Sequence, residues 1–191
     1  MKLLEEKIRK DGKILPGDIL KVDNFLNHQI DVKLMDEIGK EFYELFKDCN
    51  PDKILTIEAS GIAIASLASR YFGFVPVVFA KKTAAANMSE DVYEAKERSY
   101  TRNIDYTIHV AKEYLSEGEK VLIIDDFLAK GEAMQALINI CEQAKAQIVG
   151  CGAVICKTYQ SGEKRIKDLG YNLQALARVK HMSDDGEIEF E

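Results

Sequence analysis

The chain has 191 residues, of which 47% are apolar, and a formal net charge of −6 without a cluster of basic residues. This composition indicates one globular domain with a proper core, and it argues against nucleic acid as a partner, because the phosphate backbone would be repelled. No apolar run approaches the roughly 18 residues that span a bilayer, and the charged start is unlike a signal peptide, so we expect a cytoplasmic protein without a membrane partner.

The first thirty residues do not show the regular alternation of strands and helices that is seen later in the chain. Residues 1–12 are charged and amphipathic, and residues 13–29 mix extended-looking apolar positions with turn formers, so we expect a separate flap there. Apolar residues then recur at helical spacing, which predicts an amphipathic helix over about residues 32–47 that ends near Asn50-Pro51.

Two strand–helix–strand units follow this helix. The first comprises residues 53–57, 60–71 and 76–80, and the second comprises residues 121–124, 131–144 and 148–155. Repeated units of this kind predict an α/β fold with a mainly parallel sheet covered by helices.

The segment between the two units is polar. Residues 82–103 are too long for a passive connection, which favours a functional loop, and apolar alternation over residues 104–110 then predicts a strand. The acidic end, residues 184–191, is interpreted as a solvated tail or an edge strand. The cysteines form no C-x-x-C pair and are expected to be buried free thiols: Cys49, Cys141, Cys151 and Cys156.

Two adjacent carboxylates, Asp125 and Asp126, directly follow the buried strand 121–124. Ligands of parallel sheets bind at the carboxyl ends of the strands, and neighbouring carboxylates can accept hydrogen bonds from the vicinal hydroxyls of a sugar. From Ala129 the chain has small residues and Gly131, which leave backbone N–H groups able to wrap a phosphate at a helix start. The stretch therefore predicts a site for a sugar diol and a phosphate.

Simpler interpretations of the acidic pair stay open. The two aspartates could cap neighbouring backbone, or they could be the acidic pair of a receiver domain. The receiver is disfavoured because its pair ends the first strand, whereas a complete strand–helix–strand unit precedes Asp125 here.

Other polar residues also follow predicted strands. Ser60 and Gly61 could hold an anion with their N–H groups or could simply cap a helix. Lys81 and Lys82 could neutralise an anionic leaving group or could be solvated. Lys157 ends the last apolar strand, so it should emerge at the same edge as Asp125.

The run from Val121 to Ala133 resembles the phosphoribosyl pyrophosphate (PRPP) motif of type I phosphoribosyltransferases, an apolar strand followed by an acidic pair and a Thr-Gly-x-Thr-like turn. It departs from that motif at Lys130, Glu132 and Ala133, where side-chain hydroxyl contacts are lost and backbone binding survives. A carboxylate at Glu132 would repel a phosphate unless it pointed away. The Ala-x-Gly-x-Ala turn, together with residues 20–29, is similar to the xanthine-specific branch of the family, and the resemblance extends over nearly the whole chain.

The resemblance implies the type I phosphoribosyltransferase fold as one domain over residues 1–191, with a small hood over the carboxyl ends of the strands. The hood would comprise about residues 1–30 and segments after residue 156. Residues 82–103 would form a mobile loop that closes over the reacting centre, with Ser99-Tyr100 in place of the family's Ser-Tyr dipeptide. The implied reaction is purine salvage, in which xanthine receives the 5-phosphoribosyl group of PRPP to give XMP and pyrophosphate. Guanine and hypoxanthine are candidate further bases.

The resemblance also assigns roles to individual residues. Asp125 and Asp126 would be catalytic; Ala129, Lys130, Gly131, Glu132, Ala133, Ser60, Gly61 and Lys81 would bind PRPP; and Leu20, Asn27 and Lys157 would bind the base. Ala129 stands where hypoxanthine-guanine enzymes carry an aspartate near purine N7, so that candidate general base is missing. The implied cofactor is Mg²⁺ held mainly by PRPP, and the implied assembly is a homodimer. A PRPP-sensing regulator without catalysis, or an enzyme for a different base, are the alternatives.

Overall fold

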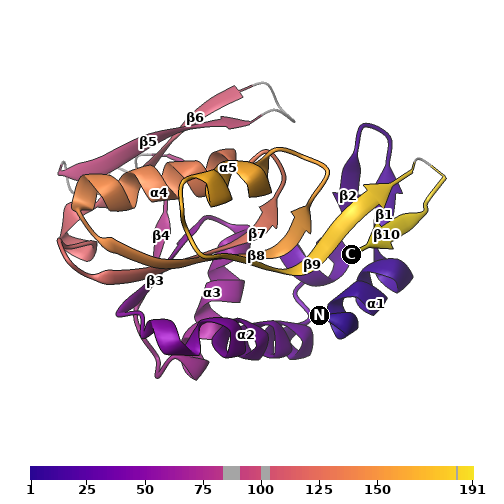
Figure 1. Cartoon of the computed structure of the whole chain (residues 1–191), viewed down its shortest axis with the longest axis horizontal. Coiled ribbons are helices and arrows are strands. Elements are labelled where there is room, and N and C mark those ends of the chain that lie inside the picture. Colours follow the sequence, from indigo (N-terminus) through magenta and orange to yellow (C-terminus); the bar gives the residue numbers. More distant parts are fainter. Residues whose placement is uncertain (84–90, 100–103, 184) are drawn as a thin grey trace.

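The computed structural model of the protein (Figure 1) describes residues 1–83, 91–99, 104–183 and 185–191. At its centre is a six-stranded sheet with the order β10-β9-β8-β7-β3-β4. Its strands are β3 (Lys53–Ile57), β4 (Val77–Ala80), β7 (Lys120–Leu128), β8 (Gln147–Lys157), β9 (Leu173–Met182) and β10 (Ile188–Phe190). Every neighbouring pair is parallel except β10 with β9. The predicted mainly parallel sheet is confirmed, and of the two interpretations of the acidic end the structure shows the edge strand.

Helices cover both faces of this sheet (Figure 1). One face carries α2 (Val32–Phe46) and α3 (Ser60–Tyr71), and the other carries α4 (Glu132–Ala144) and α5 (Gly162–Asp168). The predicted amphipathic helix is confirmed as α2, and it begins where the side chain of Asp31 accepts a hydrogen bond from the Leu34 N–H at 3.1 Å.

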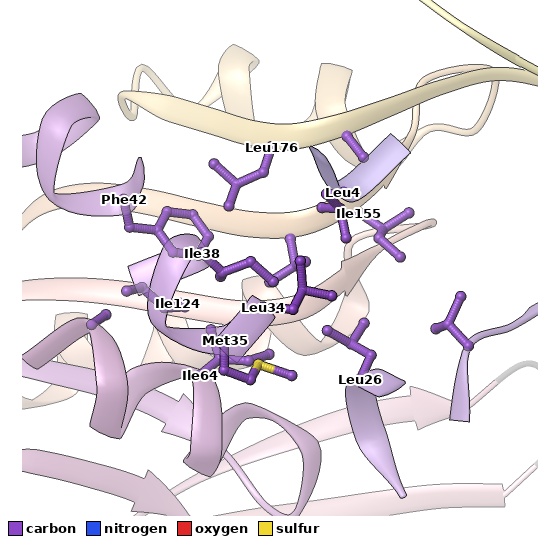
Figure 2. Close-up of a cluster of buried hydrophobic side chains, with 14 of the residues drawn as sticks. Leu4, Leu26, Leu34, Met35, Ile38, Phe42, Ile64, Ile124, Ile155 and Leu176 are labelled. Atoms are coloured by element: carbon purple, nitrogen blue, oxygen red, sulfur yellow. The ribbon is translucent and has the colours of Figure 1, made fainter. Parts of the chain in front are cut away.

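The alternating side chains of β7 connect two hydrophobic clusters. Leu122 and Ile124 lie in the cluster that includes α2 and α3, whereas Val121 and Ile123 lie in the cluster that includes α4. This is the side-chain period of a strand buried on both faces. Figure 2 shows the first cluster, in which Ile124 lies among side chains from α2, α3, β8 and β9.

Helix α2 approaches β8 closely because this strand has glycines beneath two phenylalanine rings. A Cβ atom on Gly152 would lie 2.7 Å from Cε1 of Phe42, and one on Gly150 would lie 2.6 Å from Cε1 of Phe46. Carbon atoms do not approach so closely. The two rings therefore occupy the space that side chains would otherwise fill on this strand.

A two-stranded antiparallel ribbon, β5 (Val92–Ser99) and β6 (Ile104–Ala111), lies against α4 (Figure 1). The strand predicted over residues 104–110 is confirmed. The expectation of a loop throughout residues 82–103 is wrong, because residues 92–99 pair with β6 along their whole length. The sequence pattern does not reveal β5 because most of its residues are polar; among its described side chains only Ala95 is buried.

The N-terminal segment forms α1 (Lys2–Asp11), the hairpin β1 (Lys13–Leu15) and β2 (Ile19–Lys21), and a short π-helical turn, Asp23–Asn27. These elements lie at the end of the sheet near β9 and β10 (Figure 1). The guanidinium of Arg9 donates to the carbonyl of Ile188 at 2.6 Å, so α1 is attached to the edge strand β10.

Three of the four cysteines are buried free thiols, as expected: Cys141, Cys151 and Cys156. Burial raises the pKa of each of these thiols to about 12. Cys49 is also free, but it is half-buried. Across the described parts of the chain, no helix has the length and apolar character needed to cross a membrane.

Candidate functional site

A cleft of about 690 Å³ lies where the carboxyl ends of β3, β7 and β8 meet the tip of the β1–β2 hairpin. Its lining comprises Gly17, Asp18, Ile19, Ile57, Ser60, Lys82, Asp125, Asp126, Phe127, Ala129, Lys130, Gly131, Glu132, Ala133, Met134, Lys157 and Gln160. The carboxyl edge of an open parallel sheet is the usual place for a ligand. The structure therefore brings the acidic pair, the following turn, Ser60 and Lys157 together around one space.

The acidic pair lies within a strand rather than beyond its end. The expected strand 121–124 continues as β7 to Leu128, and both Asp125 and Phe127 are in register with β8. The carboxylate of buried Asp125 accepts a hydrogen bond from the Asp126 N–H at 2.9 Å. The carboxylate of Asp126 accepts one from the Phe127 N–H at 2.9 Å and one from the side-chain amide of Asn27 at 3.1 Å. A paired strand and fixed donors thus orient the two carboxylates.

The turn after β7 has the backbone geometry of an anion site. Gly131 is the N-cap of α4 and has a φ of 82°, a left-handed conformation that favours glycine. The following residues, Glu132 and Ala133, begin a 13-residue helix whose N–H groups and dipole attract negative charge. This part of the lining can hold a phosphate with backbone donors alone.

The charge of Glu132 is compensated from α5. Its carboxylate lies 2.8 Å from Nη1 of Arg165. The same guanidinium donates to the backbone carbonyl of Lys130 at 3.3 Å, and the Gly162 N–H donates to the carbonyl of Ala129 at 2.9 Å. Helix α5 therefore holds the turn at Ala129, Lys130 and Glu132.

Of the expected anion-binding residues that follow β3 and β4, some line the cleft and others lie outside it. Ser60 lines the cleft, but Gly61 does not: a Cβ atom on Gly61 would lie 1.8 Å from Oγ1 of Thr56, so this glycine permits close packing of α3 on β3. Lys81 exchanges backbone hydrogen bonds of 2.9 Å with His109 and lies outside the lining, whereas Lys82 lines it.

The opposite wall of the cleft is built around Lys157 and Asp18. The ammonium group of Lys157 donates to the backbone carbonyl of Asp18 and lies 3.6 Å from its carboxylate. The carboxylate also accepts hydrogen bonds from the Tyr159 hydroxyl and the Gln160 side-chain amide. Burial lowers the pKa of Lys157, and the charge of Asp18 opposes this effect. The hairpin tip is thus attached to the end of β8.

Two residues expected at this wall are placed differently. Leu20 is buried in the core, because alternation along β2 directs its neighbour Ile19 into the cleft instead. Asn27 lies outside the lining, although its amide reaches Asp126. No sequence pattern identifies Asp18 and Gln160, since only the folded hairpin brings them together.

The expected mobile loop falls partly on residues 84–90 and 100–103, which lie outside the described part of the chain. In the Ser-Tyr dipeptide, Ser99 is the last residue of β5, and Tyr100 is among the residues that are not described.

Comparison with known proteins is consistent with this geometry. A model of the phosphoribosyl transferase domain matches residues 21–181. The chain is 54% identical over 185 residues to xanthine phosphoribosyltransferase 1 of Clostridium perfringens, with 97% of each chain covered. It is 52% identical over 190 residues to xanthine phosphoribosyltransferase of Laribacter hongkongensis, with 100% of each covered.

Solved structures show the same fold at low sequence identity. Adenine phosphoribosyl transferase from Trypanosoma brucei, solved in complex with AMP, pyrophosphate and ribose-5-phosphate, superposes with a TM-score of 0.78 at 18% identity. The match covers 96% of this chain and 82% of that one. Adenine phosphoribosyltransferase from Giardia lamblia gives a TM-score of 0.76 at 21% identity, covering 93% of this chain and 98% of that one.

Proposed function

The chain belongs to the phosphoribosyltransferase family and has the type I fold of that family, and we propose that it transfers the 5-phosphoribosyl group of PRPP to xanthine, forming XMP and pyrophosphate in purine salvage. The observation that carries this proposal is the cleft itself. Asp125, Asp126 and the glycine turn before α4 line one part of it, and Lys157 lines another. A sugar phosphate and an oxygen-bearing base can therefore lie side by side.

The acidic pair is proposed to bind the ribose. Asp125 and Asp126 would accept hydrogen bonds from the two ribose hydroxyls, and the backbone N–H groups of residues 129–133 would hold the 5-phosphate. The reaction displaces pyrophosphate at the anomeric carbon, where positive charge grows on the sugar. Two oriented carboxylates stabilise that charge, and the chain needs no covalent nucleophile.

Ser60 and Lys82 are proposed to face the pyrophosphate. Both line the cleft after the carboxyl ends of their strands, and the Lys82 N–H donates to the Glu58 carboxylate at 2.7 Å, which fixes the chain here. Lys81 lies outside the cleft lining, but its positive charge could still attract the pyrophosphate. Gly61 would act indirectly, by allowing α3 to start close to β3.

The base is proposed to bind between Lys157 and the β1–β2 hairpin. The ammonium of Lys157 would donate to an exocyclic oxygen of the purine, which favours 6-oxopurines over adenine. Asn27 offers a donor and an acceptor for a second oxygen, such as that of xanthine. Leu20 would support Ile19, whose side chain reaches the cleft. On this proposal residues 1–30 and the segments after residue 156 form the hood of one phosphoribosyltransferase domain.

Mg²⁺ is proposed as the cofactor. Oxygen donors suit this ion, which keeps much of its hydration and binds through few carboxylates together with substrate phosphates. Asp125 and Asp126 fit that requirement, because they are adjacent carboxylates at the cleft. When bound, the ion neutralises charge on the pyrophosphate. A homodimer and a cytoplasmic location are proposed from membership of the family alone.

The first experiment mixes the purified protein with Mg²⁺-PRPP and, separately, xanthine, guanine, hypoxanthine or adenine, and measures nucleotide and pyrophosphate. Rapid formation of XMP with weaker use of the other bases is the expected result. Preference for adenine would overturn the assignment of Lys157, and PRPP binding without any product would favour a PRPP-sensing regulator.

A further inference from the structure

The phosphate-binding turn contains an acidic residue, and the structure shows how its charge is balanced. Glu132 is in the first turn of α4, next to Gly131, where the proposed function places the 5-phosphate of PRPP. A carboxylate facing that phosphate would oppose binding by direct repulsion. Binding of the 5-phosphate therefore requires that the charge of Glu132 be neutralised or that its side chain point away.

Arg165 of α5 meets both requirements. Its Nη1 lies 2.8 Å from the Glu132 carboxylate and 3.3 Å from the carbonyl of Lys130. Its aliphatic stem is also close to the turn, because a Cβ atom on Gly131 would lie 3.6 Å from Cδ of Arg165. One side chain thus contacts Lys130 and Glu132, the residues on either side of Gly131.

The backbone of α5 is packed too tightly against the turn for this contact to be loose. A Cβ atom on Gly162 would lie 2.5 Å from the Ala129 carbonyl oxygen and 2.8 Å from the Gly131 nitrogen. The Gly162 N–H donates to that carbonyl at 2.9 Å. Helix α5 and the turn form one packed unit, and Arg165 is the residue of α5 that pairs with the charge of Glu132.

We propose that Arg165 is a positioning residue for PRPP: it holds the Glu132 carboxylate away from the 5-phosphate and fixes the Lys130 carbonyl so that the N–H groups of the turn face the cleft. This inference rests on the proposed function. Arg165 is not proposed to contact the substrate. Its effect acts through Glu132, and it should therefore depend on the charge of that residue and on ionic strength.

The test measures binding of ribose 5-phosphate and of Mg²⁺-PRPP by calorimetry, together with KM and kcat. Arg165→Ala should raise the Kd for ribose 5-phosphate and the KM for PRPP by roughly tenfold, because an unpaired carboxylate then lies beside the phosphate, and should change kcat little. Glu132→Gln in the same chain should restore most of the affinity, since the repulsion is removed. High salt should shrink the defect of Arg165→Ala by screening the charge.

Lys164→Ala is the matched control. It removes one positive charge from the same helix, and Lys164 pairs with Asp168 rather than with the turn. The Kd for ribose 5-phosphate and the KM for PRPP of this variant should stay close to those of the unchanged protein. The inference would be overturned if Arg165→Ala caused no defect, or if its defect were equally large with and without Glu132→Gln. Failure of the unchanged protein to bind PRPP would instead overturn the proposed function, so the two failures are distinguishable.

Discussion

Lys157 shows how the surroundings of one residue set its chemistry. Burial lowers the pKa of its ammonium group from the ordinary 10.5, and Asp18 opposes this effect. The group therefore loses its proton at a lower pH than a surface lysine does. Between the folded-state pKa and 10.5 the unfolded chain binds more protons at this site, so its contribution to stability increases with pH there.

The lowered pKa of Lys157 and the residue at position 129 together predict the pH dependence of the reaction. Because Ala129 stands where hypoxanthine-guanine enzymes carry their candidate general base, activity with xanthine should rise with pH as the purine itself ionises. It should fall again when Lys157 is deprotonated, at a pH below 10.5. The measurement is kcat/KM for xanthine over neutral and alkaline pH. Lys157→Arg should move the fall to higher pH, because a guanidinium keeps its proton; an unmoved fall would assign it to another group.

Lys157→Ala tests the assignment of this residue to the base. Loss of a charge-assisted hydrogen bond should lower kcat/KM for xanthine by about 10-fold to 100-fold. PRPP should still bind with nearly unchanged Kd, because its proposed site is on β7 and the following turn. Calorimetry with PRPP and steady-state kinetics with xanthine separate the two effects, and equal losses would indicate a structural role.

At the scale of elements, the β1–β2 hairpin is attached to the end of β8 chiefly through Asp18. Asp18→Ala removes the carboxylate that accepts hydrogen bonds from Tyr159 and Gln160 and forms the ion pair with Lys157, and it leaves only the backbone carbonyl as an acceptor for Lys157. We expect faster amide hydrogen exchange in residues 13–21 and a higher KM for xanthine, with exchange in β7 unchanged. Asp11→Ala is a control, since its partner Lys7 lies on α1. Unchanged exchange in the hairpin would contradict the attachment.

The contact between α2 and β8 makes a second prediction at this scale. Gly152→Ala places a methyl group 2.7 Å from the Phe42 ring, and we expect it to destabilise the protein by about 1–3 kcal/mol. Phe42→Leu in the same chain provides space and should recover part of that loss. Urea denaturation of the single and double variants measures the coupling, and additive losses would contradict direct contact.

The elements that could be predicted from the sequence are those with a strong apolar pattern. The buried strands and helices of both strand–helix–strand units have such a pattern, and it also places Asp125 at the carboxyl edge. Strand β5 escapes prediction because it is polar. Two features depend on contacts between elements distant in the sequence: Ile19 rather than Leu20 lines the cleft, and Arg165 pairs with Glu132. No local pattern contains them.

At the scale of the whole molecule, one sheet joins the two hydrophobic clusters. Because β7 contributes alternate side chains to both, neither cluster can open without disturbing the same strand. We expect one cooperative unfolding transition, with coincident curves from far-UV circular dichroism and tyrosine fluorescence. Separate transitions would contradict this coupling.

The buried thiols give the molecule an internal reporter of this opening. Cys151 and Cys156 lie in β8 with a pKa of about 12, so the thiolate that reacts with alkylating reagents is scarce and sealed from solvent in the folded state. Cys49 alone should be modified quickly. The rate at which the other thiols are modified then measures how often the central strands separate, and saturating PRPP should slow that rate without altering modification of Cys49.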